Sequence, residues 1–315
     1  MPGQVRVAIV GAGRMAEEHA RVYAALPDAA LVGIHSRSRD RAEALAARHG
    51  IPAVFDSVAD LAAGTGADLV LIAVNELSML AIIREAARFP WTLFLEKPPG
   101  YTLAVAEAIG ETVRAAERVA YVGLNRRYYA ASLAAEAALA AGSGPRYIVV
   151  NDQQSYAEAR SHGHPEEVVR HFMYANSIHL VDYLRLFGRG AVTAVERDGV
   201  WRGEETFLLA ADVTFESGDR GRYEALWQAP GPWAVSIATR EQRLEMRPLE
   251  SLAIQRAGTR RAEAQALDPI DQTYKAGFYR QAEDMIRAMR GAAHRMPTLD
   301  AAMETMRLIH AIYGV

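Results

Sequence analysis

Short runs of apolar, often β-branched residues alternate with longer amphipathic stretches over the first 125 residues. Such short apolar runs are typical of strands that are buried on both faces, as in a parallel sheet. They predict strands at 5–10, 31–36, 54–55, 68–74, 92–98 and 119–125. The intervening stretches predict helices at 14–26, 40–49, 77–88 and 102–118. Repeated strand–helix units predict an α/β domain with a doubly wound parallel sheet.

The pattern changes after residue 125. An alanine-rich helix is predicted at 130–141, and it ends at a Gly-Ser-Gly-Pro turn. The later runs RYIVVND, TFLLAADVTFE, GRYEALWQA and WAVSIATR often alternate polar with apolar residues, as strands with one solvated face do. Helices are predicted at 177–187, 274–289 and 300–313. We therefore expect a first domain at 1–122 and a second, α+β domain at 123–315 with a largely antiparallel open sheet.

Composition narrows the class of protein. The chain has 315 residues, a formal net charge of −3 and no cysteine. The absence of cysteine excludes disulfides and thiolate metal sites, and the charge gives no electrostatic reason to expect nucleic acid or a membrane surface as partner. No apolar run is long enough to cross a bilayer, and the N-terminus lacks the features of a signal peptide. We expect a cytoplasmic protein that acts on a small molecule.

A glycine-rich turn follows the first predicted strand and opens the first helix. Its residues Gly11, Gly13 and Ala16 match the pattern G-x-G-x-x-G/A. The first glycine permits the tight turn, the second lets the backbone approach a pyrophosphate, and the alanine lets helix and strand pack closely. Unpaired N–H groups at the helix N-terminus, around Arg14 and Met15, then face the phosphates. This context predicts a Rossmann-type domain that binds a nicotinamide dinucleotide.

The end of the second strand favours NADP(H) over NAD(H). An acidic residue there would bind the ribose 2′-hydroxyl of NAD, but this chain has the segment His-Ser-Arg-Ser-Arg at 35–39. Ser36 can donate a hydrogen bond to a 2′-phosphate, and Arg37 can form a charge-assisted fork with it. The alternative is that these arginines are solvated surface charges.

Three further motifs point to a family. The tripeptide Glu96-Lys97-Pro98 ends a predicted strand, VGLNRRY leads into the second domain, and an H-x-x-D pair begins at His179. In this order and spacing, together with the glycine turn, they resemble the glucose–fructose oxidoreductase/inositol dehydrogenase/MocA family over the whole chain. The resemblance implies an NAD(P)-dependent oxidoreductase that acts on a sugar, cyclitol or similar polar molecule, and a homodimer or homotetramer.

The resemblance implies that Lys97 contacts both the nicotinamide region and the reacting oxygen, with Glu96 beside it and a Lys97–Pro98 bond that is often cis. Ligands of open α/β sheets bind at the carboxyl ends of the strands, where Lys97 is predicted to lie. Partial burial near a cationic nicotinamide would lower the pKa of a lysine, which suits proton transfer. The alternative is a surface salt bridge between Glu96 and Lys97.

His179 and Asp182 stand three residues apart, which places them on one face of a predicted helix. Asn176 or Ser177 is suited to cap its N-terminus. The resemblance implies that His179 reaches the substrate oxygen beside Lys97. Asp182 is then expected to orient the histidine or to bind substrate.

The chain departs from the family pattern at two places. Many members have an aspartate four residues before the histidine, where this chain has Ala175 followed by Asn176. Either Asn176 acts as a neutral hydrogen-bond partner, or Lys97 carries the proton transfer nearly alone. The loop at Val74 and Asn75 is expected to lie along the nicotinamide ribose, although it lacks the usual proline.

Other polar residues of the second domain are weaker candidates. Arg127, Tyr128 and Arg170 are expected to line the substrate side, and each is equally compatible with a structural role. The histidines at 162 and 164 have no accompanying ligand set, so no metal is expected.

We thus expect an NADP(H)-dependent oxidoreductase in which Lys97, with His179, is the acid and base. Two alternatives remain on the same fold. One is a non-catalytic dinucleotide or sugar sensor. The other is an enzyme that retains its cofactor and uses transient oxidation for elimination, hydrolysis or sugar-to-sugar exchange.

Overall fold

The computed structural model describes residues 3–315 and divides into two compact units. The first unit contains the chain up to Asn125 together with Ile270–Met303, and the second contains Arg126–Pro269 together with Glu304–Val315. The sequence pattern predicts instead that all residues beyond 122 belong to the second domain. The segment 270–303 groups with the first unit because its helix packs on the first helix of the chain: the centroid of the Phe278 ring lies 4.5 Å from that of the His19 ring, tilted by 38°, and Arg290 pairs with Asp28.

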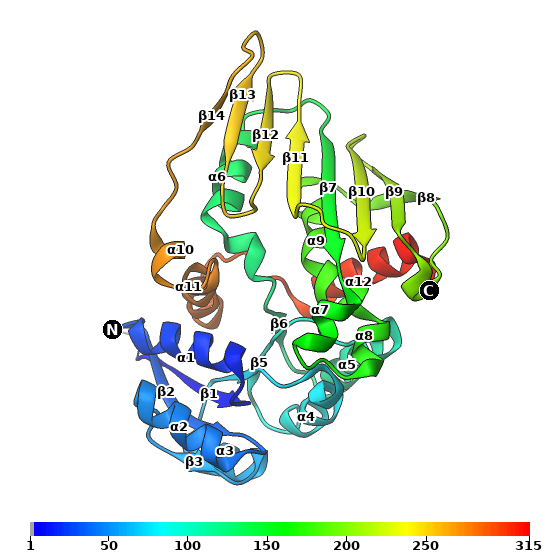
Figure 1. Ribbon diagram of the computed structural model, residues 1–315. Helices are drawn as coiled ribbons and strands as arrows, with labels where there is room; N and C mark the ends of the chain where they lie inside the picture. The colour runs from blue at the N-terminus through cyan, green and yellow to red at the C-terminus, as the bar shows by residue number, and fades with distance from the viewer. Residues whose placement is uncertain (1–2) are drawn as a thin grey trace. The chain divides into compact units, whose positions relative to one another are not determined.

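The first unit is built on a six-stranded parallel sheet (Figure 1). Its order is β3-β2-β1-β4-β5-β6, which is the doubly wound arrangement with a crossover beside β1. The strands are β1 (Val5–Val10), β2 (Ala29–His35), β3 (Val54–Phe55), β4 (Leu69–Ile72), β5 (Thr92–Leu95) and β6 (Ala120–Val122). Each contains apolar residues at nearly every position, and all of β4 is buried, as a strand covered on both faces requires.

Within residues 3–315, five helices connect these strands, and α10 and α11 join the unit from a later part of the chain. Among the seven, α1 contacts α2 and α11, whereas α4 contacts α3 and α5. Their bounds are α1 (Arg14–Ala25), α2 (Arg39–His49), α3 (Val58–Thr65), α4 (Met79–Ala86), α5 (Leu103–Ala115), α10 (Ile270–Thr273) and α11 (Phe278–Met289). A 3-10 turn, η1 (Glu76–Ser78), precedes α4. The hydrophobic pattern does not predict α3, a short, alanine-rich helix of eight residues.

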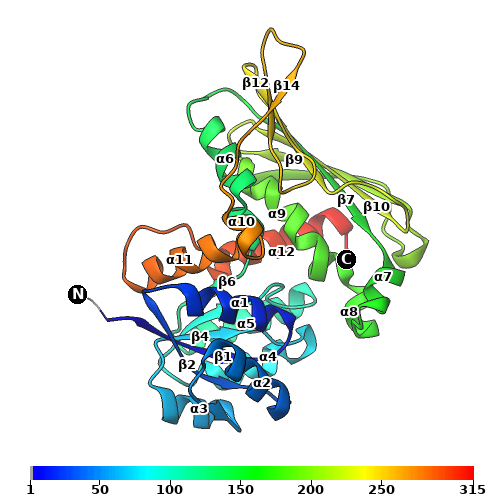
Figure 2. The ribbon, with the colours of Figure 1, turned by 60° about the vertical axis from the view of Figure 1, so that its left-hand side comes forward.

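The second unit has an eight-stranded sheet with helices on one side, as Figure 2 shows for α6 and α9. Its order is β14-β13-β12-β11-β7-β10-β9-β8, and all of its pairs are antiparallel except β7 with β10. The strands are β7 (Tyr147–Gln154), β8 (Val192–Asp198), β9 (Leu208–Phe215), β10 (Arg220–Trp227), β11 (Ala234–Ala238), β12 (Gln242–Met246), β13 (Ala253–Arg256) and β14 (Ala262–Ala264). Alternate residues of β7 and β10 are buried, which confirms the expected sheet with one covered face.

The helices of this unit cover the buried face of that sheet, and α12 begins in the first unit and ends here. They are α6 (Ala130–Leu139), α7 (Tyr156–Ser161), α8 (Glu166–Arg170), α9 (Ile178–Phe187) and α12 (Leu299–Tyr313), with the shorter turns η2 (Asn125–Tyr128), η3 (Met173–Ser177) and η4 (Gly203–Glu205). Tyr313 of α12 reaches the sheet, where its hydroxyl lies 3.0 Å from that of Tyr223.

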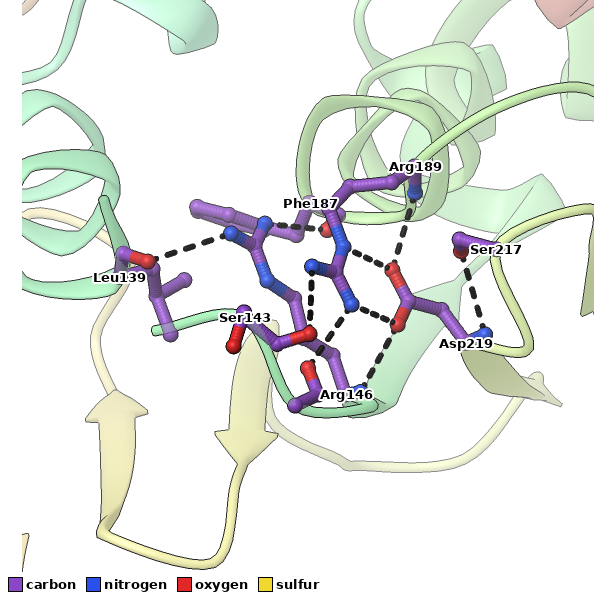
Figure 3. Close-up of polar contacts among 8 residues, drawn as sticks. Leu139, Ser143, Arg146, Phe187, Arg189, Ser217 and Asp219 are labelled. Atoms are coloured by element: carbon purple, nitrogen blue, oxygen red, sulfur yellow. Dashed lines mark hydrogen bonds and ion pairs between the residues drawn. The ribbon is translucent and has the colours of Figure 1, made fainter. Parts of the chain in front are cut away.

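A buried carboxylate joins three connections of the second unit (Figure 3). Asp219 is fully buried and accepts hydrogen bonds from Arg189 Nη2 at 2.6 Å, from Arg189 Nε at 2.8 Å and from the backbone N–H of Arg146 at 2.8 Å. Arg146 in turn donates to the backbone oxygens of Phe187 and Leu139. The network therefore ties the hairpin between β9 and β10 to the ends of α6 and α9.

Candidate functional site

The glycine turn joins β1 to α1 in a conformation that only glycine adopts easily. Gly11 has a φ of +117°, and a Cβ at this position would lie 2.1 Å from the backbone oxygen of Ala73. Gly13 is the N-cap of α1 and has no side-chain cap, and a Cβ there would meet nothing within 4 Å. Ala16 is fully buried. The turn thus packs against the end of β4 and leaves the N-terminus of α1 open.

A pocket lies at the carboxyl ends of β1, β2 and β4, beside this turn. It is lined by the predicted residues Gly11, Gly13, Ser36, Arg37, Val74 and Asn75, and also by Val10, Ala12, His35, Ser38, Arg41, Ala73 and Ile82. The Asn75 side chain accepts a hydrogen bond from the N–H of Ser78 at 2.9 Å, so it caps η1. Arg14 and Met15 belong to the first turn of α1 and are absent from the lining of this pocket.

Groups that attract anions line the pocket. The first N–H groups of a helix lack partners within the helix and attract phosphates. Arg37 and Arg41 both line the pocket, and neither forms an ion pair with another residue in the range 3–315. Arg39, between them in sequence, is instead held by Glu43 and Asp56. Two unpaired guanidinium groups and no carboxylate line this end of the pocket.

Lys97 lies directly after β5 in the same unit and is half-buried. The Lys97–Pro98 bond is cis, as the resemblance implies. Glu96 points into the unit: its Oε1 lies 2.6 Å from His19 Nε2, and its Oε2 accepts the backbone N–H of Lys97 at 3.2 Å. Only 5% of Glu96 and 1% of His19 are exposed, so this pair anchors the backbone of Lys97 from inside the unit.

In the second unit, His179 lies in the first turn of α9, and only 6% of it is exposed. The expected cap is wrong, because neither Asn176 nor Ser177 caps this helix with its side chain. The π-turn η3 leads into α9 without a break, and Ser177 has helical backbone angles. Such π-turns are frequent at functional sites because they change the direction in which side chains project.

Asp182 accepts three hydrogen bonds from neighbours in its own unit. Arg127 donates to it through Nε at 2.7 Å and through Nη2 at 2.6 Å, and the hydroxyl of Thr305 donates at 2.9 Å. Burial disfavours the charge of Arg127, but Asp182 outweighs this effect, and the pKa of Arg127 is raised above its usual value. The two residues thus form a buried, bidentate ion pair between η2 and α9.

The remaining predicted residues of the second unit are Asn176, Tyr128 and Arg170, and they differ in exposure. Asn176 donates from Nδ2 to Gln154 Oε1 at 2.9 Å. Tyr128 is buried, with 1% of its surface exposed. Arg170 lies on an exposed helix, where 71% of its side chain is accessible and its Nε is 4.0 Å from Glu166.

Arg41, His19 and Arg126 also contribute to these sites, although the sequence patterns do not single them out. Arg41 carries a signal in the sequence, since it is a third arginine close behind Arg37 and Arg39 and lies in the first turn of α2. His19 had no such signal, because its partner Glu96 is 77 residues away in the chain. Arg126 adjoins Arg127, and only the structure separates the contacts of these two arginines.

Within the described residues, no group of three or more histidines and carboxylates is arranged to hold a metal ion. In the same part of the chain, no helix has both the length and the apolar character needed to cross a membrane.

The sheet order, glycine turn and pocket define a Rossmann-type dinucleotide-binding protein. Residues 5–124 match the family model described as the oxidoreductase family with an NAD-binding Rossmann fold. This model is that of the glucose–fructose oxidoreductase/inositol dehydrogenase/MocA family, so residues 5–124 are similar to the nucleotide-binding domain of that family.

Known proteins resemble the chain beyond this match. It is 27% identical over 242 residues to scyllo-inositol 2-dehydrogenase (NAD(+)) of Bacillus subtilis, covering 73% of this chain and 69% of the relative. A solved dehydrogenase from Chromobacterium violaceum superposes with a TM-score of 0.84 at 20% identity and covers 100% of this chain and 95% of its own. UDP-N-acetylglucosamine 3-dehydrogenase from Acidithiobacillus ferrooxidans gives 0.79 at 20% identity, covering 99% and 97%. These two likenesses show the fold.

Proposed function

We propose that the chain catalyses NADP(H)-dependent hydride transfer at a carbon–oxygen centre of a sugar, cyclitol or similar polyhydroxylated molecule. The observation that carries this proposal is a single unit with a dinucleotide pocket at the strand ends and a half-buried lysine after β5. The relatives support the substrate class, because their names include an inositol dehydrogenase and a nucleotide-sugar dehydrogenase.

The preference for NADP(H) rests on the charges of the pocket. Ser36, Arg37 and Arg41 lie where a ribose 2′-substituent is expected in this fold. A charge-assisted hydrogen bond from a guanidinium to a phosphate is about twice as strong as a neutral one. The Bacillus subtilis relative is named for NAD(+), so the two cofactors must be compared directly on this chain.

When bound, the nicotinamide ring accepts or donates the hydride. We propose that Lys97 Nζ takes the hydroxyl proton when the carbon is oxidised and returns it when the carbonyl is reduced. A lysine suits this role because partial burial can bring its pKa toward neutrality. The His19–Glu96 pair would fix the backbone from which this side chain extends.

We propose that His179 assists at the substrate oxygen and that Asn176 holds substrate as a neutral group, in place of the aspartate of many family members. The amide of Asn176 is oriented by Gln154. The ion pair with Arg127 favours a structural role for Asp182, which would hold α9 and thereby His179 in place.

Substitution of Lys97 tests the mechanism. NADP+ reduction is measured with scyllo-inositol, myo-inositol, D-glucose and UDP-N-acetylglucosamine. In Lys97→Ala, turnover should fall by at least about a hundred-fold, because general acid–base catalysis contributes this much. Lys97→Arg keeps the positive charge but cannot release its proton near neutral pH, so it should be equally inactive. The dissociation constant for NADPH should change little in either variant.

Near wild-type turnover in Lys97→Arg would contradict the role of Lys97 as a base. Tight NADPH binding without turnover on any substrate would favour the sensor. Product formation without net change in NADPH absorbance would favour an enzyme that retains its cofactor.

A further inference from the structure

The end of β7 in the second unit carries a chain of buried polar groups that leads to Asn176. Gln154 accepts from Asn176 and donates from Nε2 to Asp152 Oδ1 at 2.6 Å. Asp152 also accepts from the hydroxyl of Tyr223 at 2.7 Å, and only 1% of it is exposed. These groups hold the Asn176 amide in one orientation from inside the unit.

Arg126 lies beside this chain in an unusual setting. Its guanidinium carbon is 4.3 Å from the ring centroid of Trp233, so the cation rests on the indole. The indole is itself fixed, because Trp233 Nε1 donates to the backbone oxygen of Gln153 at 2.7 Å. Arg126 Nη1 is buried and has no hydrogen-bond partner among residues 3–315. A buried N–H of a cation that lacks an acceptor is costly to the folded protein.

The neighbouring arginine shows the contrast. Arg127 donates two hydrogen bonds to Asp182 and is satisfied within the fold. Asp152 interacts electrostatically with Arg126, but burial raises the pKa of that carboxyl and so disfavours its charged form. Within residues 3–315 nothing accepts a hydrogen bond from Arg126 Nη1, so an added anion would satisfy it.

The surface beside Trp233 suits a sugar-like molecule. Trp233 lines an open groove with Pro230, Gly231, Pro232, Arg247 and Pro248. Its walls include proline and indole rings, against which the C–H face of a sugar can pack, and polar surface to which Arg247 contributes a positive charge. Because guanidinium N–H groups form a planar fork, a stacked arginine can still bind an oxyanion at its edge.

We propose that Arg126, held flat on Trp233, binds an oxyanion of the substrate, so that the enzyme acts on an acidic sugar rather than a neutral one. The oxyanion is a carboxylate or a phosphate carried by the sugar. This inference rests on the proposed function, because it assigns a substrate class to the half of the site that contains Asn176.

The test measures binding and does not depend on turnover. Calorimetry with the full chain in saturating NADP+ compares D-glucose with D-glucuronate, which differs from it only by a carboxylate at C6. D-Glucose 6-phosphate forms the phosphate arm. The variants are Arg126→Gln, which removes the charge, and Arg126→Lys, which keeps the charge but loses the fork. Arg260→Gln, at an exposed arginine of the same unit, is the matched control.

At least one acidic sugar should bind the wild type about ten-fold or more tightly than D-glucose, as one charge-assisted contact implies. This preference should vanish in Arg126→Gln, shrink in Arg126→Lys and persist in Arg260→Gln. The result that overturns the inference is a wild type without preference, or a preference that Arg126→Gln retains. Should Arg126→Gln fail to fold, an undiminished preference in Arg126→Lys would overturn it equally.

Activity separates this inference from the proposed function. Preference for the acidic sugars without NADP+ reduction on any substrate would contradict the proposed function alone. NADP+ reduction with neutral sugars and no acidic preference would contradict the assignment of Arg126 alone.

Discussion

At the scale of single residues, neighbours in sequence have different tasks. Gly11 and Gly13 both belong to the glycine turn, but only Gly11 has a positive φ and a close backbone neighbour. Arg37 lines the pocket, while Arg39 pairs with two carboxylates. The sequence pattern alone does not distinguish the two glycines from each other, nor the two arginines. The contacts of each residue decide which substitutions affect folding and which affect ligands.

Gly11→Ala should destabilise the first unit by at least about 2 kcal/mol, because it adds strain at a positive φ to a clash with Ala73. Gly13→Ala should leave the melting temperature nearly unchanged, since its Cβ meets open space, but should weaken NADPH binding by about ten-fold or more because the helix N-terminus is obstructed. Thermal unfolding and fluorescence titration measure the two effects. Equal melting temperatures for both variants would contradict this assignment.

Arg37→Ala should weaken NADPH binding by about ten-fold or more and leave NADH binding almost unchanged, because one charge-assisted hydrogen bond to the 2′-phosphate is lost. Arg39→Ala is the matched control and should affect neither cofactor. Dissociation constants for both cofactors are compared in wild type and variants. Tighter binding of NADH than of NADPH by the wild type would refute the NADP(H) preference.

At the scale of elements, buried charges fix how helices and loops attach to the second sheet. Asp219 joins the β9–β10 hairpin to the ends of α6 and α9. Burial alone would raise the pKa of Asp219, but its hydrogen bonds with Arg189, Arg146 and Ser217 outweigh burial and lower it to about 2. Asp152 shows the opposite balance, since burial dominates and its pKa is raised.

The two aspartates should therefore respond oppositely to pH. Because the pKa of Asp219 is depressed on folding, its charge stabilises the protein above about pH 4, and this contribution of about 2 kcal/mol is lost as pH falls toward 2. Asp219→Asn should thus cost most near neutral pH and progressively less in acid.

Asp152→Asn is the control. A raised pKa stabilises the folded state at low pH and loses that contribution as pH rises, so this variant should be relatively best tolerated at neutral pH. Unfolding by urea at pH 7, 5 and 3 gives both profiles. If the loss of unfolding free energy changed with pH in the same way for both variants, the charges of Asp219 and Asp152 would not govern their effects on stability.

At the scale of the whole molecule, the residues proposed to bind cofactor and substrate and to catalyse the reaction are divided between the two units. The glycine turn and Lys97 belong to the first, whereas His179, Asn176 and Arg126 belong to the second. The second unit also has a sheet with one covered face, and on its other face half-exposed residues alternate along β7 and β10. Open sheet faces and edges are natural surfaces for assembly of identical chains.

We expect a homodimer or homotetramer that uses this face. Val149 lies in its centre, paired in register with Arg222 on one side and Ser236 on the other. Val149→Asp should dissociate the assembly, because its carboxylate would be buried in the interface beside Arg222, whose charge Asp198, Asp212 and Glu224 already neutralise. Val200→Asp, at a residue that is 69% exposed, should not. Sedimentation of wild type and variants measures this, and a monomeric wild type would rule the assembly out.

The sequence by itself determined the local elements and the class of the protein. Apolar periodicity located the six strands of the first sheet to within a few residues, because each strand depends on burial of its own side chains. The glycine turn could also be predicted, because its conformation depends on the spacing of a few neighbouring residues. Short or polar elements such as β13, β14 and α8 gave no comparable pattern, and these were absent from the expectations.

Only the tertiary structure decided which distant residues meet. The parallel pairing of β7 with β10, the grouping of α11 with the first unit and the pair formed by His19 and Glu96 all join parts far apart in the chain. The adjacent residues Arg126 and Arg127 are chemically identical, and their different partners come from other strands and helices. Local patterns record what each segment buries, whereas charge pairing depends on the segments that folding brings together.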